Sequence, residues 1–342
     1  MNRALITGGL GFIGQHLAAR LLAEGFDVHV VDNAQRGSVD AAVEALRAHP
    51  RYRLTIGNVA DPAVLGMLGD GCTHIFHLAA VVGVRNVVQQ PYRVLSGSVA
   101  ALSALLDWAR AQPSLRRFVF PSTSEVYAGT LAAFGMAVPT PESTPLAIDD
   151  PGRPRTAYML SKIYGEALCR SAGVPFTIVR PHNVYGPRMG MAHVVPELLA
   201  RAWQAPPFGE LTVYSPDHRR TFCYVDDAVE LMLRLALAPA ALGGTFNVGR
   251  TAEEVSISGL ARLVAETVGR PLRLVPGPDT AGSPVRRQPD IGLAVAATGF
   301  IPQVTLRDGL ERTFRWYRDH VFEAEAMAPC GPEMAGSASL PP

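Results

Sequence analysis

Short apolar runs alternate along the chain with stretches in which apolar residues recur every three to four positions. The apolar runs cover 4–7, 28–32, 53–57, 74–79, 117–123 and 176–181. Helical periodicity lies between them, at 12–24, 39–48, 61–68, 91–111 and 157–172. Continuously apolar strands suit burial on both faces, and strand–helix alternation produces right-handed crossovers between parallel strands. The pattern predicts an α/β fold with a Rossmann-type, doubly wound parallel sheet.

The pattern becomes less regular after residue 181. Short apolar segments at 211–215 and 245–249 are separated by loops that contain Pro and Gly. We expect a Rossmann domain over 1–180, to which 221–249 returns, and a smaller α/β substrate-binding lobe built from 181–220 and 250–325. The last residues, 326–342, are small, polar and rich in Pro, which is typical of a disordered tail.

Charge and composition narrow the class of protein. The 31 basic and 30 acidic residues give a net charge of +1, so a basic surface for nucleic acid is not indicated. The chain contains no run of about 18 apolar residues, and we expect no membrane partner. Its four cysteines lack CxxC spacing, which favours a reducing cytoplasm and no metal site.

A glycine-rich segment connects the first strand to the first helix. Gly8 allows a tight turn, Gly11 lets a pyrophosphate approach the backbone, and Gly14 lets the helix pack closely. The N-terminus of the helix attracts the anion. A lone glycine pattern is weak evidence, but here it stands between a strand and a helix, and an acidic residue follows. The segment therefore predicts a dinucleotide site.

The acidic residue is Asp32, at the end of the second strand. A carboxylate there accepts hydrogen bonds from ribose hydroxyls and repels a 2′-phosphate, so we predict NAD as the cofactor. Arg36 nearby keeps NADP as a lesser alternative. Asn58 is a candidate contact to the adenine, although a turn-forming role suits it nearly as well. We expect further cofactor contacts from Phe12, Ile13, Asn33, Val59, Leu78, Ala79 and Ala80.

Tyr158 and Lys162 are four residues apart in a helical stretch and therefore share one face. A neighbouring ammonium favours the phenolate form of a tyrosine and so makes it a better base. A Tyr and a Lys at this spacing, taken alone, usually lie on the surface of an amphipathic helix and have no catalytic role. Beside a dinucleotide loop, and with Thr123 at the end of the fifth strand, it predicts a catalytic base that acts on a hydroxyl group.

Five segments together resemble the extended short-chain dehydrogenase/reductases, in particular the branch of nucleotide-sugar epimerases and dehydratases. They are TGGLGFIG (7–14), HLAA (77–80), STSEVY (122–127), YMLSK (158–162) and NVYGP (183–187). The resemblance covers about residues 3–320. It implies that Tyr158 is the base, that Thr123 binds the reacting sugar hydroxyl, and that Lys162 holds the nicotinamide ribose. Both Tyr158 and Lys162 would thus also bind the cofactor.

The resemblance also implies a substrate site. Asn183, Arg220 and Arg287 fall where the family contacts the substrate diphosphate, a task that suits the fork of arginine. Each arginine alone fits a surface ion pair equally well. Arg188 is our candidate for gripping a carboxylate at C6 of the sugar, and again a surface role is as good. The chain departs from the family pattern at Ser98, Asn58 and His182, and we interpret His182 as a pocket-wall residue.

The reaction class is left open by the sequence. Glu125, with Ser124, forms a Thr-Ser-Glu triplet similar to that of decarboxylases, and 286–291 also resembles decarboxylases. In contrast, 158–166 and 31–38 resemble epimerases. We place a UDP-sugar 4-epimerase first, acting on a UDP-hexose or UDP-uronic acid through a 4-keto intermediate. A UDP-glucuronate decarboxylase comes second and a 4,6-dehydratase third. A loop or capping role is the alternative for Glu125.

Two further expectations concern alternatives and partners. A protein that only senses NAD needs the glycine loop but not Thr123, Tyr158 and Lys162, so their presence favours an enzyme. Related enzymes pair two helices of each subunit, and we therefore expect a homodimer through 91–111 and 157–172.

Overall fold

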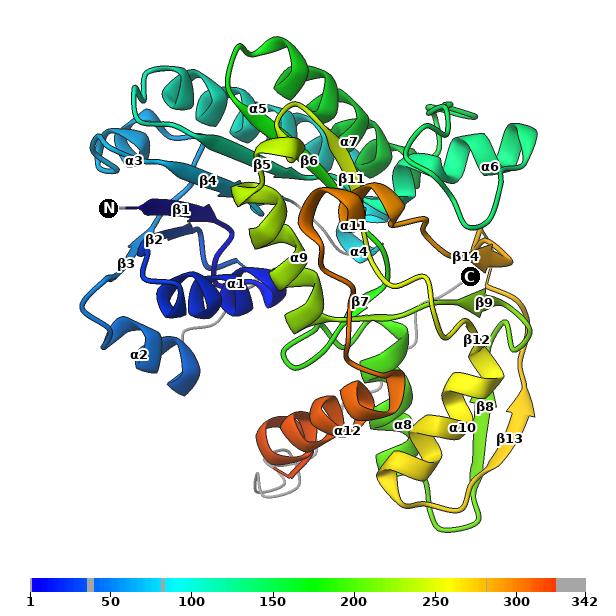
Figure 1. Ribbon diagram of the computed structural model, residues 1–342. Coiled ribbons are helices and arrows are strands. Elements are labelled where there is room, and N and C mark those ends of the chain that lie inside the picture. Colours follow the sequence, from blue (N-terminus) through cyan, green and yellow to red (C-terminus); the bar gives the residue numbers. More distant parts are fainter. Residues whose placement is uncertain (1, 36–39, 81–83, 281, 324–342) are drawn as a thin grey trace, which may run out of the picture.

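The computed structural model describes residues 2–35, 40–80, 84–280 and 282–323. Arg36, Cys330 and the segment 326–342, for which a tail was expected, lie outside the described residues. A large α/β unit fills the upper part of Figure 1, and a smaller lobe lies below and to the right of it.

One seven-stranded sheet forms the centre of the large unit. Every neighbouring pair is parallel, and the order is β11-β6-β5-β4-β1-β2-β3. The strands are β1 (Arg3–Thr7), β2 (Asp27–Asp32), β3 (Tyr52–Ile56), β4 (His74–His77), β5 (Arg117–Pro121), β6 (Phe176–Pro181) and β11 (Thr245–Val248). The expected doubly wound parallel sheet is confirmed.

Helices cover both faces of this sheet, because alternate residues of each strand point to opposite sides. Ala4 and Ile6 pack in one core with α1 (Phe12–Ala23) and α9 (Val225–Leu237). Leu5 packs in the other, with α3 (Pro62–Gly66), α5 (Pro91–Arg110) and α7 (Pro154–Ser171). Figure 1 shows α5 and α7 side by side above the sheet. The remaining helices of this part are α2 (Ala41–Arg47), α4 (Val84–Gln89) and α6 (Ala128–Phe134).

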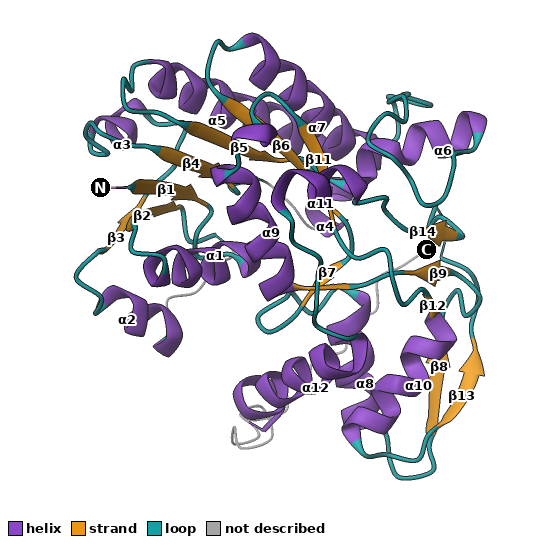
Figure 2. Cartoon of the chain, in the orientation of Figure 1, coloured by secondary structure: helices purple, strands orange, loops and turns teal. Residues whose placement is uncertain are grey.

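The smaller lobe combines very short strands with three helices (Figure 2). Strand β9 (Arg219–Arg220) lies between β12 (Val255–Ser256) and β14 (Arg286–Arg287). Strand β8 (Glu210–Val213) pairs with β13 (Arg273–Pro276), and β7 (Val184–Tyr185) pairs with β10 (Cys223–Tyr224). The helices are α8 (Val194–Gln204), α10 (Ile257–Val268) and α12 (Leu306–Tyr317), and α12 continues into a π-helical turn (Arg318–Phe322).

The chain passes back from the lobe to the large sheet before it finishes the lobe. After β10 it forms α9, which packs on α1, and a short 3₁₀ turn (Pro239–Ala241). It then adds β11 to the edge of the sheet beside β6, followed later by α11 (Gly292–Thr298), which packs on α9 and β11. This route places the carboxyl ends of β5, β6 and β11 next to the lobe strands β9 and β14.

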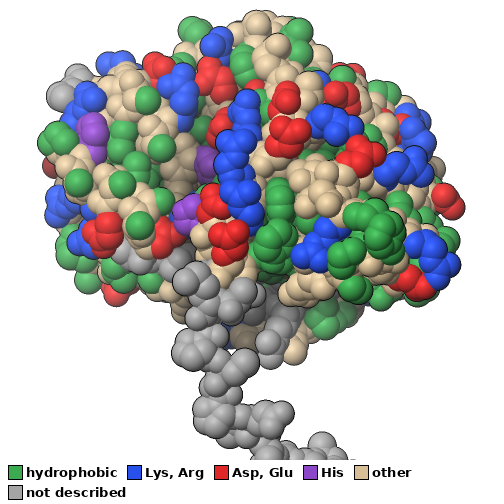
Figure 3. Space-filling view, turned by 90° about the horizontal axis from the view of Figure 1, so that it is seen from below, with side chains coloured by type: hydrophobic (Ala, Val, Ile, Leu, Met, Phe, Trp, Pro, Cys, Tyr) green, Lys and Arg blue, Asp and Glu red, His purple; other side chains and the backbone are tan. Residues whose placement is uncertain are grey.

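No helix in the described part of the chain is both long and apolar enough to cross a bilayer. The described residues also hold no cluster of three or more His, Cys, Asp or Glu side chains suited to a metal ion. On the face seen in Figure 3, basic and acidic side chains are interspersed and do not form one block of a single sign.

Candidate functional site

The glycine turn after β1 has the geometry that an anion site needs. Gly8 has φ +75°, a conformation that L side chains rarely adopt. A Cβ at Gly14 would collide with the backbone of Gly8 and Gly9, so α1 approaches this turn closely only because residue 14 is glycine. Helix α1 has no side-chain cap at its N-terminus, and its first N–H groups therefore face the turn without a competing side chain.

The Asp32 carboxylate holds this turn in place. Its Oδ2 accepts a hydrogen bond from the Leu10 N–H at 3.0 Å, and its Oδ1 accepts one from Ala34 N–H at 2.8 Å. A carboxylate at this strand end faces the position where a ribose binds. The Asn58 Oδ1 accepts from the Ala60 N–H at 3.0 Å, which is the turn-forming contact considered above.

The other expected cofactor residues surround the turn. Phe12 and Ile13 form the start of α1, and Asn33 follows Asp32, with its Oδ1 accepting from the Gln35 N–H. Val59 is buried, whereas Leu78, Ala79 and Ala80 follow β4 and are half-buried. Contacts between these residues and a cofactor stay a prediction.

Tyr158 and Lys162 share one face of α7, as predicted from their spacing. The Lys162 ammonium lies 6.0 Å from the centre of the Tyr158 ring. It donates a hydrogen bond to the carbonyl of Pro121 at 2.7 Å, which ties α7 to the end of β5. Burial lowers the pKa of Lys162 to about 8, so the ammonium form still dominates at neutral pH.

Thr123 starts the turn that follows β5. Its Oγ1 accepts from the Glu125 N–H at 3.2 Å and thereby caps the 3₁₀ helix η1 (Ser124–Tyr127). Ser124 is buried, but the Glu125 side chain is 43% exposed. The Thr123 hydroxyl and the Glu125 carboxylate therefore lie on the same turn, at the carboxyl end of β5.

A cleft of about 460 Å³ opens between this turn and the lobe. Four of the predicted residues line it, namely Glu125, Asn183, Arg220 and Arg287. In the cleft, Arg287 Nη2 pairs with Glu125 Oε1 at 2.7 Å. The pair joins the turn after β5 to the lobe strand β14, and it brings together two residues that are far apart in the sequence.

Arg220 and Asn183 shape the wall of the cleft. The Arg220 guanidinium donates to Ser283 Oγ at 2.9 Å and to the backbone carbonyls of Arg219, Pro284 and Val285. Burial, together with nearby Arg287, lowers the pKa of Arg220 to about 10, so the Arg220 guanidinium is still charged at neutral pH. Two cations close together favour an anionic ligand.

Asn183 lies two residues after the end of β6. It has φ +43° and donates from Nδ2 to the Thr221 carbonyl at 2.9 Å.

Arg188 lies outside the cleft: it pairs with Asp40, and its guanidinium stacks over the ring of Trp316. It is not among the residues that line the cleft, so a contact with a sugar carboxylate stays a prediction that would need a rearrangement. Ser98 lies in α5 with a buried hydroxyl that has no hydrogen-bond partner among the described residues.

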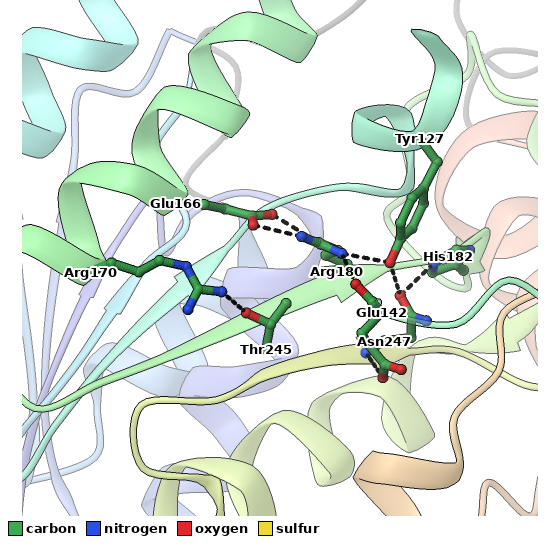
Figure 4. A network of polar contacts seen from close by, with 8 residues as sticks. All are labelled: Tyr127, Glu142, Glu166, Arg170, Arg180, His182, Thr245 and Asn247. Atoms are coloured by element: carbon green, nitrogen blue, oxygen red, sulfur yellow. Dashed lines mark hydrogen bonds and ion pairs between the residues drawn. The ribbon is translucent and has the colours of Figure 1, made fainter. Parts of the chain in front are cut away.

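A buried polar network lies behind the Glu125 turn (Figure 4). Arg180 forms two hydrogen bonds with the Glu166 carboxylate, at 2.9 and 2.7 Å, and donates to Tyr127 Oη at 2.7 Å. Tyr127 Oη and His182 Nε2 both contact Asn247 Oδ1. His182 is buried but is not among the residues that line the cleft, so its expected place in the pocket wall stays a prediction. Its hydrogen-bond partners were not predicted.

The sequence analysis also missed the far part of the cleft. Tyr214, Ser215, His218 and Thr280 line it, and His218 is buried there with a ring Nδ1 that has no hydrogen-bond partner among the described residues. These residues lie in two irregular segments, and only the pairing of β8 with β13 and of β9 with β14 brings the segments together. No local spacing signal exists for such a site.

Known proteins resemble this chain over most of its length. The model of the NAD dependent epimerase/dehydratase family matches residues 4–249. UDP-glucuronic acid decarboxylase 4 of Arabidopsis thaliana is 32% identical over 326 residues, which are 94% of this chain and 69% of the relative. UDP-N-acetyl-alpha-D-glucosaminuronate decarboxylase of Bacillus cytotoxicus is 30% identical over 337 residues, 93% of this chain and 98% of the relative.

A solved structure shares the same architecture. It is a UDP-glucuronic acid 4-epimerase from Bacillus cereus, in complex with UDP-glucuronic acid and NAD, with a TM-score of 0.79 and 25% identity. The match covers 93% of this chain and 99% of the solved chain.

Proposed function

Because the chain belongs to the NAD-dependent epimerase/dehydratase family, we propose that it removes the C6 carboxylate of a UDP-linked uronic acid as carbon dioxide. The sequence analysis placed 4-epimerisation first and decarboxylation second. The two relatives at 30% identity or more that are described above are decarboxylases, and they favour the second alternative.

The cofactor of the family is NAD, and the residues after β1 and β2 fit it. The open helix N-terminus at Gly11 suits the pyrophosphate, and the Asp32 carboxylate suits unmodified ribose hydroxyls. Bound NAD supplies the hydride acceptor for oxidation of the sugar hydroxyl at C4. In this step Tyr158 takes the proton of that hydroxyl, Thr123 Oγ1 orients it, and Lys162 keeps a positive charge beside Tyr158.

The observation that carries the proposal is the Glu125 carboxylate in the cleft, two residues after Thr123 and paired with Arg287. A ketone at C4 makes the C6 carboxylate a β-keto acid. The C5–C6 bond can then break, carbon dioxide leaves, and the bonding electron pair moves to the ketone oxygen as an enolate. C5 then needs one proton to restore the ketone, and we propose that Glu125, which lies in the cleft on the turn that begins at Thr123, is the acid that supplies it.

Arg287 connects Glu125 to the substrate side of the cleft. Its guanidinium pairs with the Glu125 carboxylate. A diphosphate in the cleft competes for Arg287, because arginine binds phosphate oxygens with both arms of its fork. We therefore expect substrate binding to draw Arg287 away from Glu125 and to leave the carboxyl group of Glu125 free to act beside C5.

The test is incubation of the enzyme with UDP-glucuronate and NAD, with carbon dioxide measured against substrate loss and the product analysed by NMR. We expect carbon dioxide in step with substrate loss and a UDP-pentose as product, because the hydride taken from C4 would return to the ketone carbon and Tyr158 would return its proton to the oxygen, which regenerates NAD. Glu125→Gln should lower the rate of carbon dioxide release about 10²–10⁴-fold, as the loss of a general acid does. Glu197→Gln is the matched control, since Glu197 lies in the same cleft but on α8, where it pairs with Arg201. Conversion to UDP-galacturonate with all six sugar carbons retained would overturn the proposal.

4-Epimerisation is the second candidate, because Thr123, Tyr158 and Lys162 suffice for reversible oxidation at C4. The structural match to a 4-epimerase solved with UDP-glucuronic acid supports it. In that case the product keeps its carboxylate, and Glu125→Gln leaves turnover nearly unchanged. A 4,6-dehydratase would instead release water from C6 of a neutral UDP-hexose or dTDP-hexose.

We also propose that the chain forms a homodimer through α5 and α7. Both helices lie on the outer side of the large sheet, where α7 exposes Tyr164 and α5 exposes Tyr92. Leu102, Leu105 and Leu106 are buried within the subunit core and are therefore not interface residues.

A further inference from the structure

Asn247 is a fully buried amide at the end of β11, and every polar atom of its side chain has a partner. Its Oδ1 accepts from Tyr127 Oη at 3.0 Å and contacts His182 Nε2 at 3.1 Å. Its Nδ2 donates to the carbonyls of Thr140 at 3.0 Å and Asp290 at 2.9 Å. The amide thus contacts four different segments of the chain.

These partners determine which way the amide faces. Backbone carbonyls can only accept, so the Nδ2 group must point toward Thr140 and Asp290. Oδ1 then faces His182 Nε2, which must carry the ring proton. Burial lowers the pKa of His182 to about 3, so the ring is neutral at the pH of any ordinary assay. The hydrogen bond from His182 Nε2 to Asn247 Oδ1 therefore keeps one direction.

The two ends of the Asn247 amide contact the two segments that carry Glu125 and Arg287, the partners of the ion pair in the cleft. On the Oδ1 side, Tyr127 ends the 3₁₀ turn that carries Glu125, and Arg180 supports Tyr127 Oη from behind. On the Nδ2 side, Asp290 follows shortly after Arg287.

The Nδ2 side is reinforced by backbone hydrogen bonds. The Thr140 N–H donates to the Gln288 carbonyl at 2.8 Å, and the Asp290 N–H donates to the Thr140 carbonyl at 2.9 Å. Thr140 and the segment 288–290 are therefore held together, and Asn247 Nδ2 donates to one carbonyl of each, that of Thr140 and that of Asp290.

We propose that Asn247 is a positioning residue that holds the Glu125 turn and the Arg287 strand in register, so that their side chains meet in the cleft. Deletion of its amide removes one hydrogen bond each from the Thr140 carbonyl, the Asp290 carbonyl, the Tyr127 hydroxyl and the His182 ring, which loosens both segments at once. Its relevance to turnover rests on the proposed function, but the positioning itself does not.

The first experiment measures whether Glu125 and Arg287 stabilise each other. Unfolding by urea is followed for Glu125→Gln, Arg287→Gln and the double variant, once in the parent chain and once in Asn247→Ala. We expect non-additive losses of stability in the parent chain and additive losses in Asn247→Ala. Equal coupling in the two backgrounds overturns the proposal, and so does the absence of coupling in the parent chain.

Matched variants separate positioning from general stability. Thr245→Val lies on the same strand and removes only an exposed contact with Arg170, so the coupling should survive in it. Tyr127→Phe removes the hydrogen bond from Tyr127 Oη to Asn247 Oδ1 and spares both Nδ2 bonds. It replaces Asn247→Ala if that variant does not fold. We expect Tyr127→Phe to weaken the coupling, and an unchanged coupling there contradicts the proposal.

The second experiment uses turnover of UDP-glucuronate. Asn247→Ala should lower kcat about tenfold to a hundredfold, as expected for a small displacement of a catalytic group, with little change in KM. In the Glu125→Gln background it should cause no further loss. Equal losses in both backgrounds would show a general structural effect. If UDP-glucuronate is not decarboxylated by the parent chain, the proposed function fails, while the urea experiment still decides the role of Asn247.

Discussion

Single residues in this protein owe their charge and their contacts to burial. Lys162 keeps its ammonium beside Tyr158 although it is buried, and four histidines are held neutral. Asp32 does more than the sequence indicated, because it binds two backbone N–H groups besides facing the expected ribose position. Its charge and its hydrogen bonds must therefore be tested separately.

Asp32→Asn removes the charge of Asp32 and keeps an oxygen that can accept from a backbone N–H. We expect the parent chain to bind NAD more tightly than NADP and the variant to lose much of this preference, since the carboxylate repels a 2′-phosphate. Dissociation constants of both cofactors, measured by calorimetry with cofactor-free protein, check it. Asp32→Ala should also weaken NAD itself. NADP binding as tight as NAD binding in the parent chain would show that Asp32 does not set the preference.

Tyr158→Phe removes the proposed base and keeps the ring. Turnover should fall about 10²–10⁴-fold, as is typical of a general base, while the melting temperature and NAD binding stay close to those of the parent chain. Thr123→Val should also lower turnover, and it further removes the cap on Glu125 N–H. Thr123→Ser keeps both functions and is the control. A loss below about threefold in Tyr158→Phe would assign the proton transfer to another residue.

Four buried histidines make stability depend on pH. Burial lowers the pKa to about 4 for His29 and His74 and to about 3 for His77 and His182. In the unfolded chain each takes up a proton near pH 6.5. The free energy of unfolding should therefore fall as the pH drops below 6.5, by up to about 1.4 kcal/mol per pH unit for each histidine. Urea unfolding at pH 7, 6 and 5 measures this slope, and His29→Gln should reduce it. A flat profile would contradict neutral burial.

The elements of the large unit could be predicted because their signals are local. Each of β1, β2, β4, β5 and β6 is a continuous apolar run, and the helices between them repeat every three to four residues. The lobe gave no such signal. Strands β7, β9, β10, β12 and β14 are two residues long, and they exist only because a distant segment supplies the partner backbone. Helices α8, α10 and α12 are amphipathic, but they stand among loops that obscured their periodicity.

Gly309 offers a test of how α12 packs on the lobe. A Cβ at this position would collide with the Tyr185 hydroxyl, which itself donates to the Leu306 carbonyl at 3.2 Å. We expect Gly309→Ala to lower the free energy of unfolding by about 1–3 kcal/mol, as overpacking of a core does. Gly66→Ala is the matched control: it is also helical, and a Cβ there meets nothing within 4 Å.

Helix propensity decides whether the control substitution, Gly66→Ala, raises or lowers the free energy of unfolding. Alanine is favoured over glycine in a helix by up to about 1 kcal/mol, so Gly66→Ala should be neutral or stabilising. Unfolding by urea, followed by circular dichroism, measures both variants. Equal effects of the two substitutions would show that α12 has room to shift away from Tyr185.

For the whole molecule, the site could be predicted only where it depends on adjacent residues. Asp32, Thr123, Tyr158 and Lys162 follow strands or share a helix face, and their placement agrees with their spacing. The Glu125–Arg287 pair and the Asn247 amide join segments that the chain brings together through its return from the lobe to β11. Such contacts depend on topology, which pattern rules do not specify.

We expect the whole molecule to assemble as a dimer through α5 and α7. The core of the subunit takes the inner faces of α5 and α7, so a dimer must use their outer faces, where Tyr92 is 80% and Tyr164 is 52% exposed. Large exposed aromatic side chains on two adjacent helices are typical of protein interfaces. We expect the mass of two chains in light scattering at micromolar concentration.

Substitutions on this surface test the geometry of the dimer as well as its existence. Tyr92→Asp and Tyr164→Asp each place a charge in the proposed interface, and desolvation of an unpaired charge should shift the equilibrium toward monomer. Phe134→Asp is the control, because Phe134 is equally exposed but ends the separate helix α6. If Phe134→Asp dissociates the dimer and the two tyrosine variants do not, the interface lies at α6 and not at α5 and α7. A parent chain with the mass of one subunit would remove the dimer altogether, and the exposed tyrosines would then need another partner.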